Sequence, residues 1–137
     1  MKIAICSSLT FAKQMIDCKK ELELLGHEAV YSDFADEFIG KTDEEKEKLN
    51  ARNFAERDVI REFWKKIKLC DAILVLNYQK KGIENYIGGN TLMEIGFAHV
   101  LDKKIFLMNE IPEIPYYKAE IIGVKPVILN GNLKMIK

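Results

Sequence analysis

Short apolar runs alternate along this chain with segments of helical periodicity. The clearest runs are residues 2–6, 72–76 and 104–108, which read Lys-Ile-Ala-Ile-Cys, Ala-Ile-Leu-Val-Leu and Lys-Ile-Phe-Leu-Met. Each is separated from the next by apolar residues at the spacing of a helix. Strands that alternate with helices predict a parallel sheet with right-handed crossover connections. The pattern therefore predicts an α/β fold.

Two weaker strand candidates complete the predicted sheet, at residues 27–32 and 127–129. Five strands in a chain of this length favour a three-layer Rossmann-like or flavodoxin-like architecture, with the strand order 2-1-3-4-5. No linker or internal repeat divides residues 1–137, so we expect a single domain. The expected helices cover residues 11–25, 42–69 with a break near 50–53, 91–101, and about 116–122.

Composition restricts the class of partner. The chain has 137 residues, 48% of them hydrophobic, with 21 basic and 21 acidic side chains and a formal net charge of zero. A neutral chain has no general attraction for nucleic acid polymers or acidic membranes, and no segment approaches the roughly 20 apolar residues of a membrane span. Its three cysteines are scattered, which argues against disulfides and a zinc site. We expect a cytoplasmic protein without a metal or cofactor.

The most informative segment is residues 86–98, Tyr-Ile-Gly-Gly-Asn-Thr-Leu-Met-Glu-Ile-Gly-Phe-Ala. It stands where a buried strand leads into a helix, and we expect Glu94 in the first turn of that helix. The spacing of Thr91 and Glu94 also matches a capping box, in which both side chains satisfy free backbone N–H groups. The pair Gly88 and Gly89 favours a ligand instead, because glycines let the backbone approach a bound group closely.

The predicted strand order brings the loop at Ser7 and Ser8 beside the segment from Gly88 to Glu94, although the two are far apart in the sequence. In the order 2-1-3-4-5 the chain changes direction between strands one and three, and ligands bind at such switch points. Neither segment matches the G-x-G-x-x-G or Walker motif, so we expect a small molecule held in another way. The candidate site residues are Ser7, Ser8, Gly88, Gly89, Asn90, Thr91 and Glu94.

These segments together resemble the nucleoside 2-deoxyribosyltransferase superfamily, which includes deoxyribonucleoside 5′-monophosphate N-hydrolases. The resemblance rests on the first strand with its serine loop, the Asp-Ala-Ile-Leu-Val strand at residues 71–75, and the Glu-Ile-Gly-Phe-Ala helix start at Glu94. It implies cleavage of the N-glycosidic bond of a nucleoside or nucleotide, with Glu94 as nucleophile. A carboxylate suits this chemistry because positive charge builds on the sugar as the bond breaks. An ionised Glu94 is expected, since a helix amino terminus favours negative charge.

The resemblance also implies roles for other residues. Ser7, Ser8 and the residues from Gly89 to Thr91 correspond to loops that contact sugar or phosphate. Phe11 is a candidate to stack on the base, and Glu62 or Asp58 to protonate the leaving base, although the matching register falls on Phe63. An additional acid that the transferases carry before the nucleophile is absent here. The resemblance further implies a homodimer or larger assembly, with residues 111–117 near the interface.

Two alternatives remain open from the sequence. The Gly-Gly-Asn-Thr-x-x-Glu segment is loosely similar to a motif of ribonucleotide phosphoribohydrolases, but it lacks their proline and third glycine. A non-catalytic nucleotide-binding or sensor module would keep the crevice and use Glu94 only as a cap. The highly charged segment after Thr42 is interpreted as a capped helix with a solvated face. The apolar Trp64 is interpreted as a core side chain.

Overall fold

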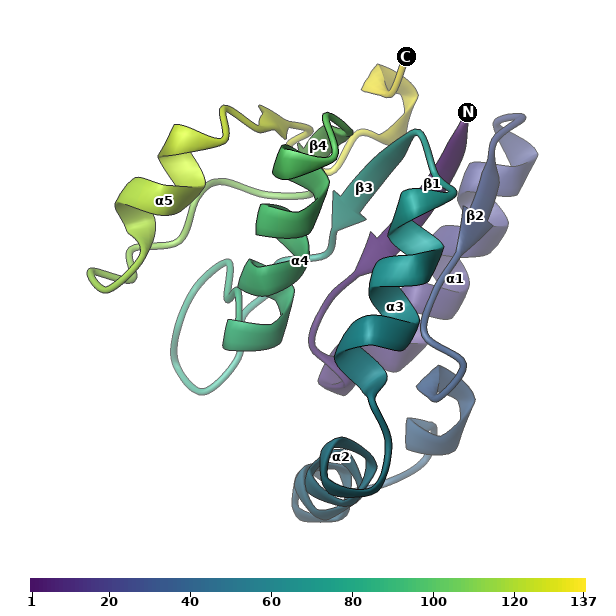
Figure 1. The fold of residues 1–137 in the computed structure, drawn as a ribbon, viewed down its shortest axis with the longest axis vertical. Helices are drawn as coiled ribbons and strands as arrows, with labels where there is room; N and C mark the ends of the chain where they lie inside the picture. Colours follow the sequence, from purple (N-terminus) through teal and green to yellow (C-terminus); the bar gives the residue numbers. More distant parts are fainter.

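The computed structural model describes all residues 1–137 and contains one five-stranded parallel sheet (Figure 1). The sheet has the order β2-β1-β3-β4-β5, and every neighbouring pair is parallel. The predicted α/β fold, strand number and strand order are therefore confirmed. The strands are β1 (Lys2–Cys6), β2 (Glu28–Val30), β3 (Ala72–Val75), β4 (Lys104–Leu107) and β5 (Val127–Ile128).

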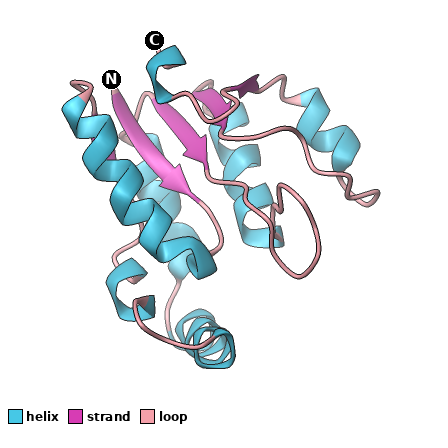
Figure 2. Cartoon of the chain, turned by 180° about the vertical axis from the view of Figure 1, so that it is seen from behind, coloured by secondary structure: helices cyan, strands magenta, loops and turns pink.

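Helices cover both faces of the sheet. On one face lies α1, together with a 3-10 turn at Leu133–Met135 near the carboxyl terminus, and the other face is covered by α3, α4 and α5 (Figures 1 and 2). The helices are α1 (Ala12–Leu24), α2 (Asp43–Glu56), α3 (Val59–Lys68), α4 (Gly89–Val100) and α5 (Lys118–Gly123).

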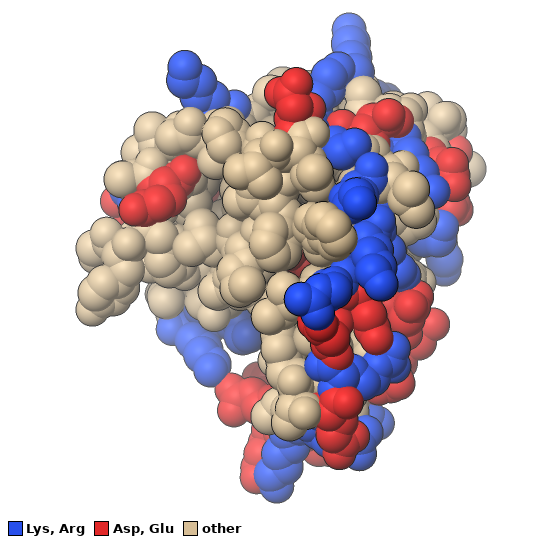
Figure 3. All heavy atoms as spheres, viewed as in Figure 1, with Lys and Arg blue, Asp and Glu red and all other residues tan.

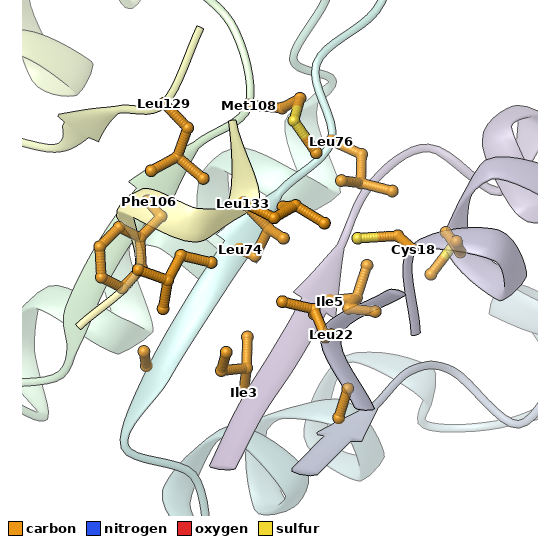
Figure 4. Close-up of a cluster of buried hydrophobic side chains, with 14 residues drawn as sticks. Ile3, Ile5, Cys18, Leu22, Leu74, Leu76, Phe106, Met108, Leu129 and Leu133 are labelled. Atoms are coloured by element: carbon orange, nitrogen blue, oxygen red, sulfur yellow. The ribbon is translucent and has the colours of Figure 1, made fainter. Parts of the chain in front are cut away.

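The central strands are apolar throughout because both of their faces are buried. Ile3, Ile5 and Leu74 point toward α1 and pack with Leu22 in the cluster of Figure 4. The alternate residues of the same strands face α3 and α4 instead. The two clusters hold the sheet rigidly between its helices, so the carboxyl ends of β1 and β3 are firmly placed.

The helix expected over residues 42–69 is two helices, and the break lies later than predicted. Arg57 and Asp58 separate α2 from α3, whereas the break was expected near residues 50–53. Asp58 starts α3 by accepting a hydrogen bond from the backbone N–H of Arg61, which defines a new amino terminus there. The expected capping box of Thr42 and Glu45 is confirmed at the start of α2.

Trp64 is not a core residue, contrary to the interpretation from the sequence. It is partly exposed on α3, and the Lys68 ammonium lies 4.5 Å from its ring centroid. The buried face of α3 is formed by Phe63 and Ile67 instead. A helix buries only one stripe, and Trp64 stands at the border of that stripe.

Two segments extend beyond the carboxyl ends of the strands. One is α2, which lies below the sheet in Figure 1, and the other is the loop of residues 77–88 between β3 and α4. This loop is held by a hydrogen bond of 2.8 Å from the Tyr86 N–H to the Tyr78 carbonyl. None of the helices combines the length and apolar character that crossing a bilayer requires.

Candidate functional site

A cleft of about 200 Å³ lies at the carboxyl edge of the sheet. Its walls come from the turn after β1, from α2, from the loop of residues 77–88, and from the start of α4. A water molecule occupies about 30 Å³ in the liquid, so the cleft has room for a small ligand. The seven predicted residues that the structure brings together along it are Ser7, Ser8, Gly88, Gly89, Asn90, Thr91 and Glu94.

Glu94 lies at the buried side of this cleft, with 6% of its surface exposed. The first residue of α4 is Gly89, two residues earlier than predicted, so Glu94 falls in the second turn. The N-cap residue is Gly88, and no side chain caps the helix. The alternative in which Thr91 and Glu94 form a capping box is therefore wrong, and the Glu94 carboxyl is left facing the cleft.

Burial raises the pKa of Glu94 from its ordinary value to about 8, and a hydrogen bond from the Cys6 thiol partly opposes this shift. The expectation that the helix amino terminus keeps Glu94 ionised is wrong, because the dipole acts mainly within the first turn. Loss of hydration is the larger effect here. In the empty cleft at neutral pH, Glu94 is therefore mostly protonated.

The turn after β1 places two hydroxyl groups in the cleft. Ser8 caps the 3-10 turn at Leu9–Phe11, where its Oγ accepts a hydrogen bond of 3.3 Å from the Thr10 N–H. The same Oγ accepts a second hydrogen bond, of 2.8 Å, from Nζ of Lys80. Ser7 donates to the carbonyl of Ser8 at 3.0 Å. The serines thus form the turn and also line the cleft.

The two glycines before α4 serve different purposes. A Cβ atom on Gly88 would lie 3.1 Å from the Tyr86 hydroxyl and 3.2 Å from its ring, so Gly88 lets Tyr86 pack over the helix start. A Cβ atom on Gly89 would meet no atom within 4 Å. Packing within the protein does not require glycine at Gly89, and the space beside it is open to a ligand.

Three predicted residues do not line the cleft. Phe11 is buried and packs edge-on against Tyr78, with the ring centroids 5.5 Å apart. Asp58 pairs with Arg61, and Glu62 pairs with Arg57 at 3.0 Å, all on the exposed surface. Their side chains therefore have structural partners, and the structure does not bring them to Glu94.

The cleft has an apolar part that the sequence analysis missed. Its aromatic side chains come from the segment after β2 and from α2 and α3, which are far apart in the sequence. Only the closed fold brings them together, so no local motif indicated them. Such rings suit the flat face of a heterocyclic base. The apolar side chains in this part are Phe34, Phe38, Phe54, Val59 and Phe63.

Asn53 on α2 is the most unusual of the missed residues. It is 8% exposed and lines the cleft, and its Nδ2 has no hydrogen-bond partner. An unpaired buried amide costs about 1 to 3 kcal/mol, which a ligand with a complementary polar edge recovers. Rotation about χ2 turns either the nitrogen or the oxygen of the amide toward such a ligand. No signal in the sequence separates Asn53 from the solvated residues of the same charged helix.

The cleft mouth carries basic side chains that were also missed. The basic side chains are Lys80, from the loop of residues 77–88, and Lys46, from α2. The neutral polar side chains of Tyr86 and Asn50 come from the same two segments. The structure has no group of three His, Cys, Asp or Glu side chains that could hold a metal ion.

Two solved structures share this fold. A 2-deoxyribosyltransferase from Bacillus psychrosaccharolyticus superposes with a TM-score of 0.53 at 18% sequence identity, covering 79% of this chain and 72% of that one. A CMP N-glycosidase from Clostridium botulinum superposes with a TM-score of 0.50 at 21% identity, covering 93% of this chain and 84% of that one. No family model matches the sequence, and no curated protein matches it significantly. At this identity, the likeness establishes the fold.

Proposed function

We propose that this protein is an enzyme of the nucleoside 2-deoxyribosyltransferase type, which cleaves or transfers the N-glycosidic bond of a nucleoside or nucleoside 5′-monophosphate. One observation carries the proposal: Glu94 is a buried carboxyl without a basic partner, and it faces a cleft at the switch point of the sheet. Both proteins with the shared fold are described as acting on such bonds.

In the proposed reaction, Glu94 acts as the nucleophile. A carboxylate oxygen of Glu94 bonds to the anomeric carbon while the bond to the base breaks and its electron pair leaves with the base. The departing base takes up a proton, and the sugar remains as an ester of Glu94. Water, or a second base, then attacks the same carbon and releases the carboxylate.

The raised pKa of Glu94 accords with this role once a substrate fills the cleft. The positive charge that develops on the sugar stabilises the ionised form of a carboxyl group that is poorly hydrated in the free protein. Burial raises the pKa of the Cys6 thiol well above its ordinary value, so the thiol stays protonated; it donates to the Ala4 carbonyl at 3.8 Å, and its interaction with Glu94 lowers the pKa of that carboxyl. Cys6 thereby stabilises the reactive, ionised form.

The test is chromatography of free base released from a panel of deoxyribo- and ribonucleosides and their 5′-monophosphates. Wild type is compared with Glu94→Gln, which has nearly the same shape and no nucleophilic carboxylate. Release by wild type alone supports the proposal, and equal release by both proteins overturns it. The preferred sugar also tests the ribonucleotide phosphoribohydrolase alternative, which requires ribonucleotides to be cleaved faster than deoxyribonucleotides.

A non-catalytic nucleotide sensor is the second candidate, and the positions of Asp58 and Glu62 favour it. Both candidate proton donors are paired with arginines outside the cleft, which leaves the departing base without the expected acid. This function predicts that nucleotides raise the melting temperature without being consumed during long incubation. Any turnover that depends on Glu94 excludes it.

The expected homodimer stays a prediction, and α4 is the helix to examine. Its outer surface has no Lys, Arg, Asp or Glu side chain, and Figure 3 shows a region without these residues over this part of the molecule. Met93 and Val100 are exposed there. Analytical ultracentrifugation of wild type and Met93→Lys tests the assembly, because a buried lysine at an interface would shift the protein toward monomer.

A further inference from the structure

The Ile87 carbonyl, in the loop that leads into α4, depends on a single side chain. Ile87 is 1% exposed and belongs to the apolar cluster between the sheet and α4. No backbone N–H donates to its carbonyl, and the Tyr117 hydroxyl is the one donor that reaches it. A buried carbonyl without a donor costs stability, so this hydrogen bond determines the direction in which the carbonyl points.

The fold holds Tyr117 firmly in this position. Tyr117 is the N-cap residue of α5, and its carbonyl accepts a hydrogen bond of 3.2 Å from the Ile121 N–H. Ile121 is fully buried in the same apolar cluster as Ile87, and the Tyr117 side chain packs against this cluster. The neighbouring Tyr116, by contrast, is 90% exposed. Of the two adjacent tyrosines, only Tyr117 is directed into the protein.

The Tyr117 hydroxyl lies close behind the cleft wall and remains a donor. Burial raises the pKa of Tyr117 above its ordinary value, and the nearby Tyr86 adds to this effect. The phenol therefore keeps its proton at neutral pH. Tyr86 lines the cleft and packs over Gly88, whereas Tyr117 does not line it. Any influence of Tyr117 on a ligand must pass through the residues in front of it.

The carbonyl of Ile87 and the N–H of Gly88 belong to one peptide group. This group is planar and trans, so the two bonds point in opposite directions. By fixing the carbonyl, Tyr117 also fixes the direction of the Gly88 N–H, which has no acceptor within the protein. Gly88 lines the cleft and is the N-cap residue of α4. Tyr117 therefore sets the orientation of a peptide group at the cleft wall.

This peptide group needs an external restraint. Gly88 and Gly89 follow it, and residues without a Cβ atom restrict the backbone least. The other end of the loop is held separately, by hydrogen bonds from Asn77 to the carbonyls of Asn109 and Glu110. Those bonds lie at the start of the loop and leave its last peptide groups free to turn. The Tyr117 hydroxyl supplies the restraint at the end that meets the cleft.

We propose that Tyr117 is a positioning residue for the cleft, whose hydroxyl holds the Ile87–Gly88 peptide group in the orientation that a bound ligand requires. This inference rests on the proposed function for its ligand, although the restraint itself can be measured without turnover. Glu94 lies in the second turn of α4, which is held by the buried Ile95 and Ala98. Loss of the hydroxyl should therefore weaken ligand binding more than it slows the chemical step.

The kinetic test compares two tyrosine variants. Tyr117→Phe removes only the hydroxyl, and Tyr116→Phe removes the same group from the exposed neighbour. In base release from the preferred substrate, Tyr117→Phe should raise KM about tenfold and change kcat less than about threefold, because binding is weakened while the nucleophile stays in place. Tyr116→Phe should change neither constant. A variant that only loses folded protein would lower the apparent kcat at an unchanged KM, and that result would overturn the proposal.

Hydrogen exchange measured by mass spectrometry tests the restraint without a ligand. Amides of residues 86–93 should exchange at least about threefold faster in Tyr117→Phe than in wild type, with a smaller change in β1 and β3. Tyr116→Phe should exchange like wild type throughout. An equal increase in all segments, or none in residues 86–93, would show that Tyr117 does not hold this peptide group.

Failure of the positioning role differs from failure of the proposed function. Absence of base release by wild type removes the proposed function, and hydrogen exchange in residues 86–93 still decides whether Tyr117 restrains the peptide group. Base release with an unchanged KM in Tyr117→Phe keeps the enzyme and removes the positioning role.

Discussion

Two asparagines are buried in this protein, and their surroundings are opposite. Asn77, at the end of β3, is fully buried and donates Nδ2 to the carbonyls of Asn109 and Glu110 at 3.1 and 2.9 Å. Its Oδ1 accepts the Asn109 N–H at 2.9 Å. Asn53, on the cleft wall, is almost as buried, yet its Nδ2 has no partner.

The difference separates scaffold from binding surface. The polar groups of Asn77 are satisfied within the protein, and they tie the chain just after β3 to the segment after β4. The amide of Asn53 is left incomplete beside an open cavity, which costs stability in the absence of ligand. Substitutions in the two regions should therefore affect different properties. Scaffold substitutions should lower the free energy of unfolding, and cleft substitutions should lower activity or ligand binding.

The largest expected effect is on the cleft side, at Glu94. Removing a covalent nucleophile lowers turnover in enzymes by about 10⁴-fold or more, so Glu94→Gln should nearly abolish base release. Because the substitution also removes a poorly hydrated carboxyl, it should not lower the melting temperature. Parallel measurement of base release and thermal unfolding checks both statements. A joint loss of activity and folding would place Glu94 with the scaffold instead.

Stability should also depend on pH through Glu94. Its pKa is about 8 when folded and ordinary when unfolded, so the folded state holds a proton over pH 5 to 8 that the unfolded state has lost. The contribution of Glu94 to stability is therefore present at low pH and is lost as pH rises, by about 1.4 kcal/mol per pH unit. Denaturant unfolding of wild type and Glu94→Gln across this range isolates the effect as a difference in slope. Parallel curves would contradict it.

On the scaffold side, Asn77→Ala should lower the free energy of unfolding by about 3 kcal/mol. The substitution removes three buried hydrogen bonds and leaves their backbone partners unsatisfied. Asn109→Ala is the matched control, since it removes only the hydrogen bond from the Asn109 side chain to the Asn77 carbonyl. If the two variants unfold at the same urea concentration, the Asn77 side chain is not the main connection between the chain after β3 and the segment after β4.

Asn53→Leu sharpens the comparison from the other side. Replacing an unpaired buried amide with an apolar group of similar size should raise the free energy of unfolding by about 1 kcal/mol while weakening nucleotide binding about tenfold. Arg52→Leu, on the neighbouring exposed position of α2, should leave binding unchanged. A destabilised Asn53→Leu would show that its amide has a structural role.

The smallest effect is expected at Glu62. Its ion pair with Arg57 is about half exposed on both sides, and such pairs contribute roughly 0 to 1 kcal/mol. Glu62→Gln should change kcat/KM by less than about twofold, because the side chain does not line the cleft. A large loss of kcat/KM would indicate that Glu62 does act as a proton donor.

The sheet and the strand-to-helix connection that carries Glu94 could be predicted because each depends on local signals. Apolar runs such as residues 72–76 indicate buried strands, and the strand order follows from the alternation of strands and helices. The cleft wall on α2 was not predictable in this way. Asn53 and Phe54 look like any residues of a charged, solvated helix, and only the tertiary position of α2 gives them a cavity to face.

The electrostatic error at Glu94 has a similar origin. The helix start could be recognised from its glycines, but a shift of two residues moved Glu94 out of the first turn. The depth at which it is buried decides its pKa, and that depth is a property of the assembled fold. The basic mouth was missed because Lys46 and Lys80 are 34 residues apart and converge only through the turn at Ser8 and Thr10.

The way α2 is attached has a consequence for protein engineering. Its only buried residue is Asn53, and neither of the two clusters that hold the sheet contains a residue of this helix. A library that randomises the cleft-facing positions of α2 would sample new ligand preferences with little loss of folded protein. Ligand selectivity can therefore be redesigned on α2 without changing the sheet, its two hydrophobic clusters or Glu94.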